Sequence, residues 1–188
     1  MTTILDTLKN TADEEKAATA LAAFARENPE ALETIIKANQ LFLEKFAPSG
    51  GENLYNAYRE TARAYKKKNL IQSNYPYDSQ NYAEAAAYYL KAAETAPDAG
   101  RKLSSLDGAA SMYRNLDDKK QWCRVKLQQV PSVSDKDKTR LYMDIARETA
   151  DKKQQKELYA KALAYAAQMS GNDDVRAETV NRLKKLTE

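Results

Sequence analysis

Apolar residues recur every three to four positions along this chain, which is the spacing of amphipathic α-helices. The clearest stretch runs from Asn81 to Pro97, with Asp78 or Ser79 available as a cap and Pro97 as a stop. Its apolar face alternates small and aromatic side chains, namely Ala85, Tyr88, Tyr89, Ala92 and Ala96. Because small residues allow a neighbouring helix to approach closely, we expect other helices to pack on both sides of this one.

The same periodicity predicts a series of helices separated by Gly, Pro, Ser and Asn residues. They are expected at about 3–9, 12–27, 29–46, 52–71, 81–97, 100–116, 118–130, 135–150, 152–169 and 173–187. Capping boxes, with a hydroxyl at the cap and a carboxylate three residues later, are predicted at Thr3, Thr11 and Ser134. Asn28 is predicted to cap the third helix, with Pro29 in its first position.

The composition agrees with an all-α protein, because Ala, Leu, Lys, Glu and Gln are common while Val, Ile and Thr are sparse. At 188 residues, 43% of them hydrophobic, the chain can form one domain or one array of stacked repeats. Residues 47–51, with the sequence APSGG, are the clearest break. We therefore expect an N-terminal helical segment at 1–47 and a helical repeat domain at 52–188.

Three helix pairs can be aligned within residues 52–188. Their second helices read NYAEAAAYYLKAA from Asn81, DKKQWCRVKLQQV from Asp118 and DKKQQKELYAKAL from Asp151, and the last two share Asp-Lys-Lys-Gln at a spacing of 33 residues. Their first helices contain YRETARAY (58–65), LDGAASMY (106–113) and YMDIARETAD (142–151). A period in the thirties with two helices per unit is typical of a helical solenoid.

These residues resemble the tetratricopeptide repeat family over roughly residues 54–169. The resemblance is carried by Tyr82, Ala85, Tyr89, Ala92 and Pro97, then by Leu106–Asp118 and by Tyr142–Leu163. The chain departs from the family in the first pair, where about eleven extra residues separate the helices, and in the third pair, which no proline closes. The resemblance implies an α-solenoid of about three antiparallel helix pairs, with the helix at 173–187 as a C-terminal cap.

In that family the first helix of each pair lines a groove that binds a segment of a partner protein. The resemblance implies that the partner-binding positions are Asn56, Arg59, Arg63, Lys66, Lys67, Arg114, Asn115, Arg140 and Arg147. Arginine dominates this set, and a guanidinium can donate two hydrogen bonds to one carboxylate. The implied partner is therefore another protein that binds through an acidic segment. The alternative is that these side chains only form a solvated helix face.

Three further residues stand out. Tyr75 and Tyr77 lie in the extra segment between the helices of the first pair, where they either contact a partner or fold back onto the neighbouring helices. Cys123 is the single cysteine, so no internal disulfide forms, and a small buried hydrophobe is the more common role for such a residue than a reactive thiol.

Several residues and motifs that enzymes and metal-binding proteins commonly use are absent from the sequence. It contains no histidine, no Gly-rich phosphate loop and no Cys-x-x-Cys motif, so we expect no enzyme activity, no cofactor and no metal site. Asp135-x-Asp137-x-Thr139 departs from a calcium loop because Arg140 stands where glycine is needed. The expected role is protein–protein interaction, as an adaptor, assembly factor or chaperone-like holder.

Charge and hydropathy leave several alternatives open. The net charge is +3, divided into −3 for residues 1–50 and +6 for the remainder. An RNA- or DNA-binding helical repeat protein is the less favoured alternative, and a structural subunit of a larger assembly is another. Residues 1–47 dock either on the repeats or on another copy, which leaves a homo-oligomer open. No stretch is long and apolar enough for a membrane span and no standard export signal is recognised, so we expect a cytoplasmic protein.

Overall fold

The computed structural model describes residues 3–46, 51–71, 78–168 and 173–187, and it contains no strand across these ranges. Its α-helices are α1 (Ile4–Asn10), α2 (Glu14–Glu27), α3 (Leu32–Phe46), α4 (Glu52–Ile71), α5 (Ser79–Thr95), α6 (Ala99–Asn115), α7 (Lys119–Gln129), α8 (Asp135–Glu148), α9 (Lys152–Gln168) and α10 (Asp173–Thr187). A short 3-10 helix, η2 (Val130–Ser132), follows α7. The all-α prediction is confirmed, and each predicted helix lies within a few residues of an observed one.

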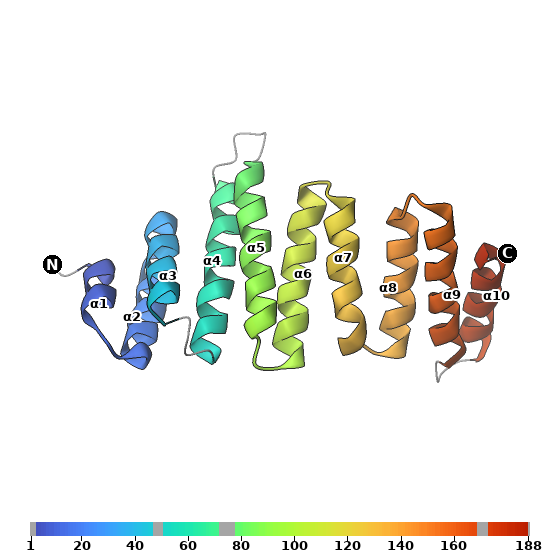
Figure 1. The fold of residues 1–188 in the computed structure, drawn as a ribbon, viewed down its shortest axis with the longest axis horizontal. Helices are drawn as coiled ribbons and strands as arrows, with labels where there is room; N and C mark the ends of the chain where they lie inside the picture. Colours follow the sequence, from blue (N-terminus) through green and yellow to red (C-terminus); the bar gives the residue numbers. More distant parts are fainter. Residues whose placement is uncertain (1–2, 47–50, 72–77, 169–172, 188) are drawn as a thin grey trace. The chain divides into compact units, whose positions relative to one another are not determined.

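The chain divides into two compact units, Met1–Asp117 and Asp118–Glu188. Unit 1 holds α1 to α6 and unit 2 holds α7 to α10. In each unit helices that are consecutive in sequence pack side by side, as α4, α5 and α6 do in unit 1 and α8, α9 and α10 in unit 2 (Figure 1). The second predicted pair is split between the units, because its two helices are α6 and α7. The predicted break at 47–51 falls mostly outside the described residues, so a division at that point stays a prediction.

Helix α5 shows why small residues matter in this fold. Ala85 and Ala92 on its packed face are fully buried, and Tyr89 is 9% exposed. On the facing helix α6, a Cβ atom added to Gly108 would lie only 2.8 Å from carbon atoms of the Tyr89 ring. Glycine therefore provides the close approach that lets this ring fill the space between α5 and α6.

The predicted caps at Thr3 and before α5 are confirmed, and the predicted cap at Thr11 is wrong. Thr3 forms the predicted capping box with Asp6, and Asp78 caps α5. At the second helix the cap is Asp13, whose side chain accepts from Lys16 N, while Thr11 Oγ1 accepts from Asp13 N instead.

The predicted role of Asn28 is also wrong. The side chain and the backbone N–H of Asn28 both donate to Phe24 O, at 3.0 and 2.9 Å, so this residue ends α2 rather than beginning α3. The next helix starts only at Leu32, after a turn in which Ala31 N donates to Asn28 O. An asparagine can satisfy orphan groups at either end of a helix, which is why the local sequence did not decide between the two roles.

The N-terminal helices share a core with α4. One buried cluster combines Leu8, Ala17, Leu21, Ala38, Phe42, Leu43, Leu54 and Ala57, which come from α1, α2, α3 and α4. A second combines Leu32, Ile35 and Ile36 of α3 with Ala64 of α4. Helices α2 and α3 are thus fixed against α4 by apolar burial within unit 1.

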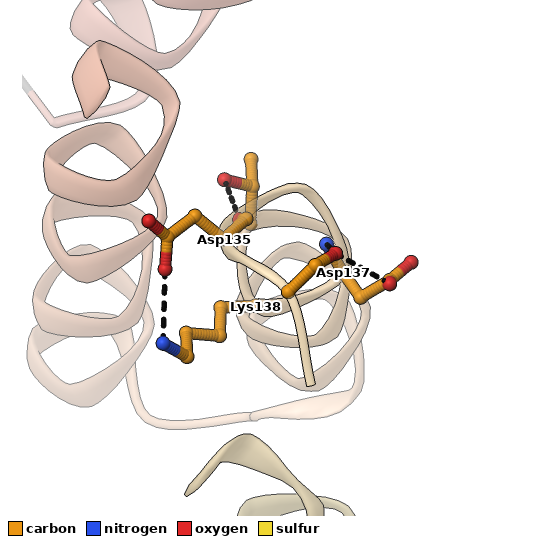
Figure 2. A network of polar contacts seen from close by, with 5 residues as sticks. Asp135, Asp137 and Lys138 are labelled. Atoms are coloured by element: carbon orange, nitrogen blue, oxygen red, sulfur yellow. Dashed lines mark hydrogen bonds and ion pairs between the residues drawn. The ribbon is translucent and has the colours of Figure 1, made fainter. Parts of the chain in front are cut away.

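The start of α8 is fixed by the third predicted cap. Ser134 Oγ accepts from Asp137 N at 3.3 Å, while the Asp135 carboxylate accepts from Lys138 Nζ at 2.9 Å. Figure 2 shows that Asp135 and Asp137 are used in two separate contacts on different sides of the helix. At the first turn of α8, Asp137 therefore takes part in the helix cap and Asp135 forms an ion pair.

Candidate functional site

Two cavities of unit 1 lie next to each other between α2 and α4. These two helices form the walls of a groove and α3 forms part of its floor. The groove consists of two cavities that share Ala25 and Glu60 as lining residues. We call the cavity that Asn39 and Asn56 line the acceptor cavity, and the cavity that Arg63 and Lys66 line the basic cavity. Together they form what we call the α2–α4 groove.

The basic cavity has a volume of about 470 Å³. Three basic side chains of α4, namely Arg63, Lys66 and Lys67, line it together with the apolar residues Leu32, Ile35, Ala64 and Leu70. Leu70 is 53% exposed, so its side chain presents apolar surface to solvent at the cavity. The cavity therefore presents positive charge beside apolar surface.

Tyr89 of α5 also lines the basic cavity. Burial raises the pKa of its hydroxyl, and the nearby Arg63 opposes this effect. The phenol is thus neutral at physiological pH and serves as a hydrogen-bonding group beside the cations.

The three basic residues differ in how they are held. Lys67 Nζ donates to Pro29 O and to Glu30 Oε1, each at 2.9 Å, so it ties α4 to the turn before α3. The Arg63 guanidinium donates to Glu60 Oε1 within the same helix, at 3.1 Å. Lys66 makes no ion pair with the part of the chain that the structure describes. Arg63 and Lys66 are therefore the basic side chains most available to a ligand.

The acceptor cavity has a volume of about 240 Å³. Its walls are mostly small or apolar: Ala18, Leu21, Ala22, Ala25, Phe42 and Ala57. Its polar lining is Glu15, Thr19, Asn39, Asn53, Asn56 and Glu60. Of the predicted binding residues, Asn56 is the one that the structure brings here.

The other predicted residues that the structure describes do not line either cavity. Arg59 is half-buried on α4 and does not line either cavity, while Arg114 and Asn115 are exposed at the end of α6. Arg140 and Arg147 belong to α8 in unit 2 and both pair with Asp144, at 4.0 and 2.9 Å. Tyr75 and Tyr77 lie outside the described residues. Of the nine predicted partner-binding residues, the structure thus gathers Asn56, Arg63, Lys66 and Lys67 in one groove and does not assign the other five to it.

Two helix pairs in different units repeat the same local geometry. In unit 1, Lys91 Nζ lies 5.8 Å from the Tyr58 ring centroid, and Arg63 pairs with Glu60 at 3.1 Å. In unit 2, Lys161 Nζ lies 5.9 Å from the Tyr142 ring centroid, and Arg147 pairs with Asp144 at 2.9 Å. In both pairs the first helix supplies the tyrosine, the carboxylate and the arginine, and the second helix supplies the lysine. The pairs α4–α5 and α8–α9 are therefore alike in contacts as well as in sequence.

Sequence reasoning missed the side chains that α2 and α3 contribute to the groove. Glu15, Asn39 and Phe42 line the acceptor cavity, whereas the sequence shows no repeat pattern in residues 1–47 and predicts a separate helical segment there. The available signal was the helical period of Leu21, Phe24 and Ala25 on α2. That period predicts a packed face but does not say which helix packs on it.

Unit 2 holds the only tryptophan and the only cysteine of the sequence. Trp122 is 6% exposed and belongs to the buried core. Cys123 is half-buried, and burial together with the Glu148 carboxylate raises the pKa of its thiol. A raised pKa lowers the thiolate fraction, which agrees with a structural rather than a reactive role.

The chain was compared with known proteins: no protein-family model matches it, and no curated sequence is significantly similar to it. Over the described ranges, none of the helices is apolar for long enough to cross a membrane. The same residues contain no group of three or more His, Cys, Asp or Glu side chains arranged to hold a metal ion.

Proposed function

We propose that this protein is a non-catalytic protein-binding module, and that the α2–α4 groove binds an acidic, partly apolar segment of a partner protein. The observation that carries the proposal is the basic cavity, where Arg63 and Lys66 stand beside the apolar surface of Leu32, Ile35 and Leu70. A partner segment with aliphatic and carboxylate side chains on one face complements both the apolar surface and the positive charge of this cavity.

The repeated geometry of α4–α5 and α8–α9 supports a related proposal, namely that the chain is a helical repeat protein similar to the tetratricopeptide repeat family. Proteins built in this way use the surface between successive repeats to hold partner segments. In this proposal α2 and α3 form a further helix pair before the pair α4–α5. The groove then lies between the first helices of these two pairs, α2 and α4.

The test uses a fluorescein-labelled 14-residue peptide of leucine and glutamate at helical spacing, titrated into the full chain and followed by fluorescence anisotropy. We expect the double substitution Arg63→Glu and Lys66→Glu to raise the Kd by about tenfold or more, because two favourable charge contacts become repulsive. The matched control is Lys102→Glu, a charge reversal at an exposed position of α6 that does not line the groove. It should leave the Kd unchanged.

Two comparison ligands separate this proposal from its rival. The same peptide with glutamine in place of glutamate should bind more weakly, and the difference should shrink as salt is added. A single-stranded RNA of similar length tests nucleic-acid binding. Binding of the RNA without binding of the acidic peptide would contradict the proposed function.

A further inference from the structure

The acceptor cavity contains a buried polar side chain that the groove's packing does not explain. Asn39 of α3 is only 2% exposed and lines the cavity. Its Nδ2 donates to Ile35 O of the same helix at 2.9 Å. Its carbonyl oxygen, Oδ1, accepts no hydrogen bond from the part of the chain that the structure describes. This oxygen is not sealed from solvent, so a ligand or water in the cavity can donate a hydrogen bond to it.

The other polar groups of this cavity are also mainly acceptors. Glu15 Oε1 accepts from Asn53 Nδ2 at 2.7 Å, and Glu60 Oε1 accepts from Arg63 at 3.1 Å, so each carboxylate retains its second oxygen. Asn56 is exposed at the cavity and adds a further amide. None of the described residues that line the acceptor cavity is basic. The cavity thus combines two carboxylates with the accessible carbonyl oxygen of the largely buried Asn39.

We propose that the acceptor cavity binds an arginine side chain of the partner segment whose acidic residues contact the basic cavity. The apolar walls fit the aliphatic part of this side chain, and its guanidinium supplies five donors that can reach acceptors in several directions. Arginine suits the cavity better than lysine because its head group is planar and more weakly hydrated. This inference rests on the proposed function, since it assigns a second contact to the same bound segment.

The two cavities give the groove opposite charge along α4. The acceptor cavity begins at Asn53, and the basic cavity extends past Lys67. Fourteen residues of helix correspond to roughly 21 Å. A bound segment with arginine at one end and carboxylates at the other meets opposite charges in both cavities when it lies in one direction along α4. In the reverse direction it meets like charges. The groove therefore selects the orientation of its partner as well as its composition.

The test uses Nα-acetyl-arginine amide as a probe, titrated into the full chain while the side-chain amide resonances of Asn39 and Asn56 are followed by NMR. We expect saturable shifts at both side chains and weaker binding of Nα-acetyl-lysine amide. Nα-acetyl-norleucine amide has an aliphatic stem without the charged head and should not bind. Equal binding of the norleucine and arginine probes would overturn the inference.

The variant Asn39→Leu keeps the branched shape and the number of heavy atoms of the side chain and removes the acceptor, so we expect it to fold, and thermal unfolding will check this. The Asn39→Leu substitution should raise the Kd of the arginine probe by about tenfold, which is the loss expected for one hydrogen bond to a charged group. Glu60→Gln should also weaken it, whereas Glu94→Gln, at an exposed position of α5, should not. An unchanged affinity in Asn39→Leu would contradict the inference.

The acidic peptide of the preceding section distinguishes the two proposals. If this peptide binds in the basic cavity and the arginine probe fails to bind, the arginine site is wrong and the proposed function stands. If the arginine probe binds and the acidic peptide does not, the proposed function is wrong, and the partner segment inferred here is wrong with it.

Discussion

Replacement of Phe42 by alanine is expected to lower the free energy of unfolding by about 3–5 kcal/mol. Phe42 is 1% exposed and belongs to the buried cluster that α1, α2, α3 and α4 share. Its ring also packs on Phe46, with 5.0 Å between the ring centroids. Loss of the ring removes buried apolar surface and leaves a void next to the acceptor cavity, so both effects reduce stability.

The measurement is urea denaturation of the full chain followed by far-ultraviolet circular dichroism. Phe42→Leu is the matched control, because it keeps most of the buried volume and should cost less than about 1.5 kcal/mol. If Phe42→Ala were no more destabilising than Phe42→Leu, the N-terminal helices would not depend on this core.

Gly108→Ala is expected to destabilise the protein by about 1–3 kcal/mol, although alanine favours helix formation over glycine by about 1 kcal/mol. The reason is steric, since the new methyl group would lie 2.8 Å from the Tyr89 ring. The ring is largely buried and cannot move away without disturbing the packing between α5 and α6.

A double-mutant cycle separates the clash from the helix propensity. In a Tyr89→Ala background the same glycine substitution should be neutral or stabilising, because the opposing ring is absent. Ser104→Ala, at an exposed position of α6, controls for the general effect of alanine on this helix. An increase in stability from Gly108→Ala in the natural background would show that α5 and α6 are not held at this close distance.

The sequence predicted the helices because their signals are local. The period of the apolar residues and the caps at Thr3, Asp78 and Ser134 involve residues within one or two helical turns. Asn28 shows the limit of such signals, since the same side chain can end one helix or begin the next. The choice depends on the turn that follows, which is fixed by contacts beyond the immediate sequence.

The groove was predicted only on its α4 side. Arg63, Lys66 and Lys67 are similar in sequence, but the structure assigns Lys67 to a contact with Glu30 and leaves Lys66 available. The α2 and α3 walls depend on which helices pack together, and periodicity does not specify that. The sequence does not identify Asn39 as a binding residue, because an asparagine on an apolar helix face does not indicate that a cavity lies beside it.

Amide hydrogen exchange of the full chain, with and without the saturating leucine–glutamate peptide, tests most directly whether the groove binds an acidic segment. The account predicts that the peptide slows exchange in α2, α3 and α4 and leaves α8 and α9 unchanged, because the lining residues of both cavities come mainly from α2, α3 and α4. Protection confined to unit 2, or bound peptide without protection in α2 to α4, would contradict it.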